Sequence, residues 1–208
     1  MNQNEAIKSL GIFGGSFDPP HHAHITLALR AIEQLHLDRL LVIPTGDAWH
    51  KTRDLTLAPH RLAMTRLAFS DVPKAMVDSR EIDRQGSTFT FDTIEEIMQD
   101  YPSAKLFLCI GGDQAQAFTT WHRWKDILNR VTVVVAFRPE DKNGAQPDNN
   151  AQWHNGLPAG AIRLEMPSLA ISATDIRLQL AQSDTFPSAL PMGVCEYIQQ
   201  HSLYKNDR

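Results

Sequence analysis

The sequence lacks several features that would assign it to other functional classes. Its 208 residues include only two cysteines, Cys109 and Cys195, which offer neither a disulfide framework nor a CxxC metal pair. No run of about eighteen apolar residues and no apolar N-terminal signal region occurs. The net charge is −4 and no Lys/Arg-rich tract stands out, which argues against nucleic acid or a membrane surface as a main partner. We therefore expect a cytoplasmic protein with two buried free thiols.

What is present is the composition of an ordinary globular protein, arranged as alternating apolar and amphipathic segments. The length allows one sizeable core, so we expect a single domain over residues 1–208. Apolar runs predict strands at 9–13, 40–44, 75–77, 106–110, 131–136 and 162–166. Helical spacing predicts helices at 23–37, 58–70, 91–100, 113–119, 124–128, 174–182 and 193–201. Uniformly apolar strands separated by helices predict a Rossmann-like α/β fold, a doubly wound parallel sheet with helices on both faces.

Two polar stretches interrupt this alternation. Residues 46–59 form a predicted loop with Trp49, His50 and Lys51 at its tip. Residues 139–160 are rich in Asn, Gly and Pro and predict a mobile surface excursion.

The segment after the first predicted strand, residues 14–24 (GGSFDPPHHAH), has the character of an anion site. Its glycines let a phosphate approach the backbone, and its prolines fix the chain just before a helix begins. His21 and His24 are three residues apart, so we place both on one face of the first helical turn, beside N–H groups that the helix leaves unbonded. Helix dipole and imidazole donors would then point at the same phosphate chain.

This segment resembles the GG[ST]FDPxHxGH motif of the nucleotidyltransferase α/β phosphodiesterase superfamily, with Ala23 in place of the motif glycine. In that superfamily the two histidines hold the triphosphate and stabilise the transition state of adenylyl or cytidylyl transfer. The resemblance implies these roles for His21 and His24.

A second segment, residues 171–177 (ISATDIR), resembles the superfamily's ISSTxIR string, with Ala173 in place of a serine. Physically it is a helix start. Ser172 and Thr174 offer hydroxyls and N–H groups where the helix dipole favours an anion, and Arg177 follows one turn later. We expect it to form the opposite wall of one triphosphate site.

Further segments resemble one branch of the superfamily, the bacterial nicotinate-nucleotide adenylyltransferases. They are residues 43–51 (IPTGDAWHK), 88–93 (TFTFDT), 110–113 (IGGD) with Trp121, 137–139 (FRP) and 190–204 (LPMGVCEYIQQHSLY). The likeness covers nearly the whole chain. His122 stands where a tyrosine often follows the tryptophan of that branch.

The resemblance implies that nicotinate mononucleotide attacks the α-phosphorus of ATP. Catalytic roles fall on His21, His24 and Arg177, and ATP contacts on Gly14, Gly15, Ser16, Phe17, Gly111, Asp113, Arg138, Ser172 and Thr174. Mononucleotide contacts fall on His50, Lys51, Thr90, Trp121 and His122. Mg²⁺ is the expected cofactor, bound mainly to ATP oxygens rather than to the protein. The sequence leaves the oligomeric state open, including a homo-oligomer.

Three other functions stay in view at this point. A related transferase could use nicotinamide mononucleotide, phosphopantetheine or a polyol phosphate as acceptor. The nicotinate and nicotinamide forms are the hardest to tell apart, because recognition of the acid or the amide depends on one or two hydrogen bonds. A non-catalytic nucleotide-binding regulator would keep the site without the chemistry. A dinucleotide-dependent oxidoreductase lacks support, since no GxGxxG follows the first predicted strand.

Overall fold

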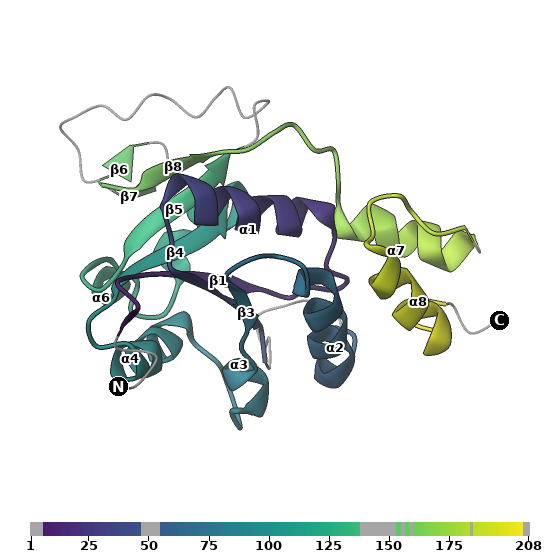
Figure 1. Cartoon of the computed structure of the whole chain (residues 1–208), viewed down its shortest axis with the longest axis horizontal. Helices are drawn as coiled ribbons and strands as arrows, with labels where there is room; N and C mark the ends of the chain where they lie inside the picture. The colour runs from purple at the N-terminus through teal and green to yellow at the C-terminus, as the bar shows by residue number, and fades with distance from the viewer. Residues whose placement is uncertain are drawn as a thin grey trace.

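A computed structural model describes residues 6–46, 55–137, 153–154, 157–158, 160–183 and 185–205. Its centre is a sheet of six parallel strands in the order β3-β2-β1-β4-β5-β8 (Figure 1). These strands are β1 (Ser9–Gly15), β2 (Arg39–Pro44), β3 (Ala75–Val77), β4 (Lys105–Gly111), β5 (Thr132–Phe137) and β8 (Ile162–Glu165). A separate antiparallel pair joins β6 (Trp153–His154) to β7 (Leu157–Pro158).

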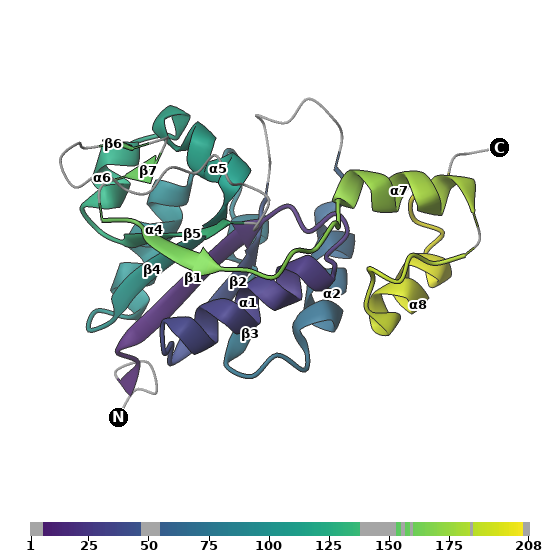
Figure 2. The ribbon, with the colours of Figure 1, turned by 90° about the horizontal axis from the view of Figure 1, so that it is seen from above.

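Helices connect the strands. They are α1 (His22–Gln34), α2 (Ala58–Phe69), α3 (Arg80–Asp83), α4 (Thr90–Asp100), α5 (Gly112–Ala117), the 3₁₀ turn η2 (Phe118–Thr120), α6 (Trp124–Leu128), α7 (Ala173–Gln182) and α8 (Met192–Gln200). Figures 1 and 2 both place α7 and α8 together at one end of the molecule, beyond α2.

The alternation of side chains along the strands divides the interior into two cores. In β2, Leu40 and Val42 belong to one core, whereas Leu41 and Ile43 belong to the other. The first core lies under α1, α2, α7 and α8, and the second under α4, α5, η2 and α6, so helices cover both faces of the sheet (Figure 2). A strand that is buried on both faces must be apolar at every position, which explains the uninterrupted apolar runs of the sequence.

The strand order reverses between β1 and β4, which are neighbours in the sheet although the strands β2 and β3 lie between them in the chain. In open α/β sheets such a reversal leaves a crevice beyond the carboxyl ends of the two strands, where ligands bind. The loop that follows β1 and the turn that follows β4 therefore occupy the position at which the fold can receive a nucleotide.

The Rossmann-like fold and the six strands are confirmed, with ends that move by two residues at most. Three elements were not expected: the two-residue strands β6 and β7, within the predicted 139–160 excursion, and the single turn α3. The turn α3 is held by polar contacts, since Asp78 accepts hydrogen bonds from Arg80 and Ser79 donates to Asp83. The expectation of two buried thiols is wrong for Cys195, which is only partly buried, whereas Cys109 is buried. Most of 139–160 lies outside the described residues.

Candidate active site

The loop between β1 and α1 is shaped around Phe17, whose backbone lies in the left-handed region with φ of 46°. A bulky residue rarely adopts this conformation. The Phe17 side chain is buried and packs edge-on against Phe13 and Phe69, with ring centroids 5.4 and 5.9 Å away. Its ring also meets that of His24 at 5.1 Å. The apolar core thus supports the imidazole directly.

The two motif histidines lie against each other at the start of α1. Their rings are stacked, with centroids 3.8 Å apart and planes 22° apart. The expectation that both belong to the first helical turn is wrong in one detail, because His21 is the extended residue before the helix (φ −147°) and α1 begins at His22. The extended backbone at His21 still brings the two rings together.

The surroundings of His24 fix its protonation state. Burial, followed by the charge of His21, lowers the pKa of His24 well below its ordinary value, so the ring is neutral at pH 7. The backbone N–H of His21 donates to Nδ1 of His24 at 3.2 Å. Because Nδ1 is thereby an acceptor, the proton of the neutral ring is on Nε2. His24 is a neutral N–H donor.

Open space lies beside these donors at the ends of the two central strands. A Cβ atom added to Gly14, at the end of β1, would meet no atom within 4 Å, and the same holds at Gly111, at the end of β4. Neither glycine is required by packing of the described residues. Both leave the sheet edge at the reversal point open, as a phosphate chain that approaches the backbone needs.

The start of α7 meets the loop from the opposite side. Ser172 caps this helix, since its Oγ accepts hydrogen bonds from the N–H groups of Thr174 and Asp175 at 3.2 and 3.5 Å. Arg177 donates from Nη2 to Oγ1 of Thr174 at 3.1 Å and from Nη1 to the carbonyl of Asp18 at 2.8 Å. The arginine expected to bind phosphate therefore also ties α7 to the β1–α1 loop.

Two buried charged residues that the sequence did not single out hold this loop from behind. Asp18 is 1% exposed and accepts a hydrogen bond from the hydroxyl of Tyr204 at 2.6 Å. Arg61 of α2 is 2% exposed and donates to the carbonyls of Ser16, Gly46 and Thr56 at 3.0, 3.3 and 2.8 Å. Asp18 is part of the recognised motif, which was the available signal. Nothing in the pattern of α2 distinguishes Arg61 from a surface arginine.

Of the residues expected to frame a pyridine ring, His122 lies beside the 88–90 segment, and Trp121 packs on a core residue. The ring of His122 lies 4.5 Å from that of Phe89, the residue before Thr90, which begins α4. Trp121 lies 5.1 Å from the buried ring of Phe118. The structure thus brings His122 next to the 88–90 segment, although these residues are far apart in sequence.

Other expected site residues are placed less directly. Asp113 is exposed in the first turn of α5, whose cap is Gly111. His50, Lys51 and Arg138 lie outside the described residues. Among the residues that the structure describes, no group of three His, Cys, Asp or Glu side chains could hold a metal ion. No helix in the described part of the chain is long and apolar enough to cross a membrane.

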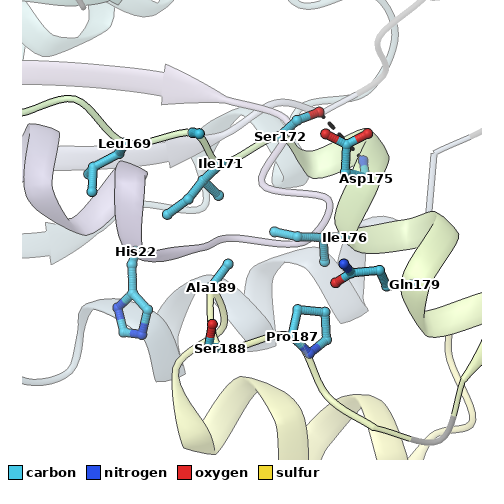
Figure 3. A pocket seen from close by; sticks show the side chains of 11 residues that line it. His22, Leu169, Ile171, Ser172, Asp175, Ile176, Gln179, Pro187, Ser188 and Ala189 are labelled. Carbon is cyan, nitrogen blue, oxygen red and sulfur yellow. Dashed lines mark hydrogen bonds between the residues drawn. The ribbon is translucent and has the colours of Figure 1, made fainter.

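A cavity of about 440 Å³ lies beside the site rather than in it. It is lined by the 169–172 segment, the first turns of α7, residues 187–189 and His22 (Figure 3). Ser172 lines the cavity and is also an expected site residue, whereas the cavity lining does not include Gly14, Gly111 or His24. We therefore assign the nucleotide site from the strand ends and the histidine pair.

Known proteins resemble this chain over most of its length. Residues 12–179 match the cytidylyltransferase-like family. A curated relative from Albidiferax ferrireducens, named "Probable nicotinate-nucleotide adenylyltransferase", is 44% identical over 199 residues, which are 96% of this chain and 99% of the relative. The chain belongs to the nicotinate-nucleotide adenylyltransferase family. Members from Methylibium petroleiphilum and Neisseria meningitidis are 39% and 33% identical and cover 97% and 96% of the chain, respectively, and 94% and 100% of their own lengths.

Solved structures extend the likeness to the fold of the nicotinate-nucleotide adenylyltransferase family. Nicotinic acid mononucleotide adenylyltransferase of Plasmodium falciparum superposes with a TM-score of 0.75 at 18% identity when complexed with APC, and 0.74 at 17% when complexed with NaAD. Each alignment covers 95% of this chain and 97% of the other. At these identities the superposition speaks for the fold alone.

Proposed function

We propose that this protein transfers the adenylyl group of ATP to nicotinate mononucleotide, which yields deamido-NAD and pyrophosphate, a step of NAD biosynthesis. The observation that carries the proposal is the stacked His21–His24 pair at the start of α1 beside the open strand ends at Gly14 and Gly111. Kinship with the nicotinate-nucleotide adenylyltransferases over 96% of the chain supplies the acceptor.

The reaction is an in-line displacement. An oxygen of the mononucleotide 5′-phosphate forms a bond to the α-phosphorus of ATP, while the bond from that phosphorus to the α,β-bridging oxygen breaks. The bridging oxygen leaves with its electron pair on pyrophosphate. Because a phosphate monoester is largely ionised at neutral pH, no general base is needed. Positioning and charge stabilisation then account for catalysis.

His24 has the chemistry that this transition state requires. Its Nε2–H is a donor whose direction is set by the bond from the His21 backbone to Nδ1 and by the Phe17 ring. We place it on the α-phosphate, where negative charge develops, with His21 on the neighbouring phosphates. Two segments bind the rest of the triphosphate. The phosphates approach the backbone at Gly14, Gly15, Ser16 and Phe17. The β- and γ-phosphates contact Ser172, Thr174 and Arg177.

Mg²⁺ enters this proposal as part of the ATP substrate. The groups around the loop are imidazoles, a guanidinium and backbone N–H groups, which suit phosphate oxygens rather than a cation. The only carboxylate built into the loop, Asp18, is turned to Tyr204 and Thr56. A cation carried by the triphosphate neutralises charge on the departing pyrophosphate.

The acceptor end is assigned to the aromatic side of the sheet edge. Trp121, His122 and Thr90 frame the pyridine ring, and His50 and Lys51 bind the mononucleotide phosphate. Gly111, Asp113 and Arg138 complete the adenosine side. The expectations of a cytoplasmic location and a single domain accompany the proposal as predictions.

The test is pyrophosphate release from ATP and Mg²⁺ with one acceptor at a time. Nicotinate mononucleotide should be the best substrate, and nicotinamide mononucleotide, phosphopantetheine and a polyol phosphate should be weaker. If nicotinamide mononucleotide were the better substrate, the acceptor assigned here would be wrong and adenylyl transfer would stand. Absence of release with every acceptor would make the protein a nucleotide-binding regulator.

A further inference from the structure

Tyr204 lies 186 residues from Asp18 in sequence, yet its hydroxyl donates to Oδ1 of that carboxylate at 2.6 Å. Asp18 is 1% exposed, so the bond is inside the protein. The backbone N–H of Thr56 donates to the other carboxylate oxygen at 3.4 Å. Burial and the Asp18 carboxylate raise the pKa of Tyr204, and its hydroxyl therefore keeps its proton over the whole pH range of an assay.

The backbone around Tyr204 is bent to reach this position. Tyr204 has φ of 63° and Ser202 has φ of 50°, both in the left-handed region that bulky side chains rarely adopt. Such conformations persist only where surrounding contacts hold them. The turn that follows α8 therefore carries strain, and it places the phenol beneath the β1–α1 loop.

Only Phe17 stands between Asp18 and a direct contact with His24. Asp18 follows Phe17, which also has a left-handed backbone (φ 46°) and whose ring contacts that of His24 at 5.1 Å. The loop is thus held on one side by aromatic packing and on the other by Asp18. Arg177 adds a bond to the Asp18 carbonyl at 2.8 Å.

We propose that Tyr204 is a positioning residue for adenylyl transfer, which sets the direction of the His24 imidazole through Asp18 and Phe17. The inference rests on the function proposed above. The alternative is that Tyr204 only stabilises the fold, as any buried hydroxyl paired with a carboxylate would. The two alternatives predict different kcat values for a Tyr204 variant and a control variant that lose the same amount of stability.

The chain offers a matched control. Tyr197 in α8 is also partly buried, and its hydroxyl contacts Nδ1 of His60 at 3.0 Å. Tyr197→Phe and Tyr204→Phe each remove one hydroxyl from the same region, but only the second contact leads to the loop. Both variants should melt a few degrees below the wild type, a loss typical of one hydrogen bond.

Kinetics with ATP and nicotinate mononucleotide distinguish the alternatives. Tyr204→Phe should lower kcat about tenfold, because the variant loses a charge-assisted hydrogen bond that positions a catalytic group. Tyr197→Phe should change kcat less than about twofold. The KM for nicotinate mononucleotide should stay within about twofold in both, since binding of the acceptor does not use His24. Equal kcat values in the two variants would overturn the proposal.

A second measurement does not require turnover. In ¹⁵N-histidine-labelled protein, His24 of the wild type and of Tyr197→Phe should give the signature of a neutral ring protonated on Nε2, assigned with His24→Gln. Tyr204→Phe should mix the two ring tautomers, and an unchanged His24 signal would overturn the inference. If the wild type releases no pyrophosphate, the proposed function fails, whereas the ring signal still decides whether Tyr204 positions His24.

Discussion

The two ends of the candidate site are built in different ways. At the proposed ATP end, Arg61 of α2 donates a hydrogen bond to Ser16, and Arg177 of α7 and Tyr204 of the turn after α8 donate to Asp18. At the pyridine end, His122 is exposed and contacts Phe89 through its ring, and Trp121 lies against Phe118. One end is held by hydrogen bonds that involve the buried side chains of Arg61 and Asp18, and the other by contacts between tilted rings.

In the proposed function the two ends have different tasks, which would account for this difference. A transition state that gains charge at one phosphorus requires donors fixed in advance, because reorganising them during the reaction would raise the barrier. A planar ring is recognised by stacking over an area, which tolerates small displacements of the aromatic side chains. Changes at the ATP end should therefore affect kcat and stability, whereas changes at the pyridine end should affect acceptor binding.

Replacing Arg61 by Ala should have the largest effect, because this buried side chain joins the β1–α1 loop to the Gly46 and Thr56 backbone. Three backbone carbonyls lose a buried donor, and we expect the free energy of unfolding to fall by about 4 kcal/mol. Urea denaturation measures this loss. Arg66→Ala, an exposed position on the same helix, should change it by less than about 0.5 kcal/mol; similar losses in both would contradict the role given to Arg61.

Replacing His24 by Ala tests the ATP end alone. The variant loses the donor placed on the α-phosphate, so kcat should fall about a hundredfold or more, with a smaller change in the KM for ATP. Steady-state pyrophosphate release gives both constants. His22→Ala removes an exposed imidazole from the same helical turn and serves as the control. Nearly unchanged turnover in His24→Ala would remove this residue from the mechanism.

Replacing Trp121 by Ala tests the pyridine end. Loss of one stacking ring should raise the KM for nicotinate mononucleotide about tenfold and leave the KM for ATP unchanged. Trp124→Ala, in the neighbouring helix α6, should alter neither constant. Equal increases in both KM values for Trp121→Ala would mean that the two ends are not separate.

Replacing Gly14 by Ala probes the open space at the end of β1. A Cβ there meets no atom within 4 Å, so stability should change by less than about 0.5 kcal/mol. If a phosphate occupies that space, the KM for ATP rises about fivefold, because the methyl group displaces it. At Gly15 the added Cβ would lie 3.0 Å from the Phe17 ring, so Gly15→Ala should lose stability as well. Unaltered ATP kinetics in Gly14→Ala would place the phosphates elsewhere.

The smallest effect concerns pH. The unfolded chain binds a proton at His24 near pH 6.5, and the folded chain binds it only at lower pH, since burial and His21 lower the pKa. Between these values the unfolded state holds more protons, so stability falls as pH falls. We expect His24 to account for about 1 kcal/mol between pH 6.5 and 5.5. His24→Gln should flatten the denaturation midpoint over this range; an identical slope would contradict the lowered pKa.

Most of the fold could be predicted from the sequence because its signal is local. Strands β1, β2, β4 and β5 are apolar at consecutive positions, and the helices repeat their apolar residues at helical spacing. The turn α3 has no such signal, since Asp78, Arg80 and Asp83 hold it through polar bonds. Local pattern therefore predicted the six strands of the main sheet and its covering helices, and it missed α3 and the two-residue strands β6 and β7.

The candidate site was predictable only as far as its motifs reach. The segment 14–24 and the start of α7 gave the histidines and Arg177, and the fold brings them to one edge. The burial of Arg61 could not be foreseen, because it depends on carbonyls 45 and 15 residues away. The left-handed backbone of Phe17 was equally hidden, since it results from tertiary packing rather than from a glycine.

The distance in sequence between Asp18 and its partners has a consequence for protein synthesis. The ribosome completes the 14–24 motif before its partners, because Arg177 follows Asp18 by 159 residues and Tyr204 follows it by 186. N-terminal segments generally fold first as a chain emerges. Here β1 and α1 can assemble while the loop between them still lacks both contacts. A growing chain thus carries the complete 14–24 motif before the contacts that hold its loop, and these contacts can form only after Arg177 and Tyr204 have emerged.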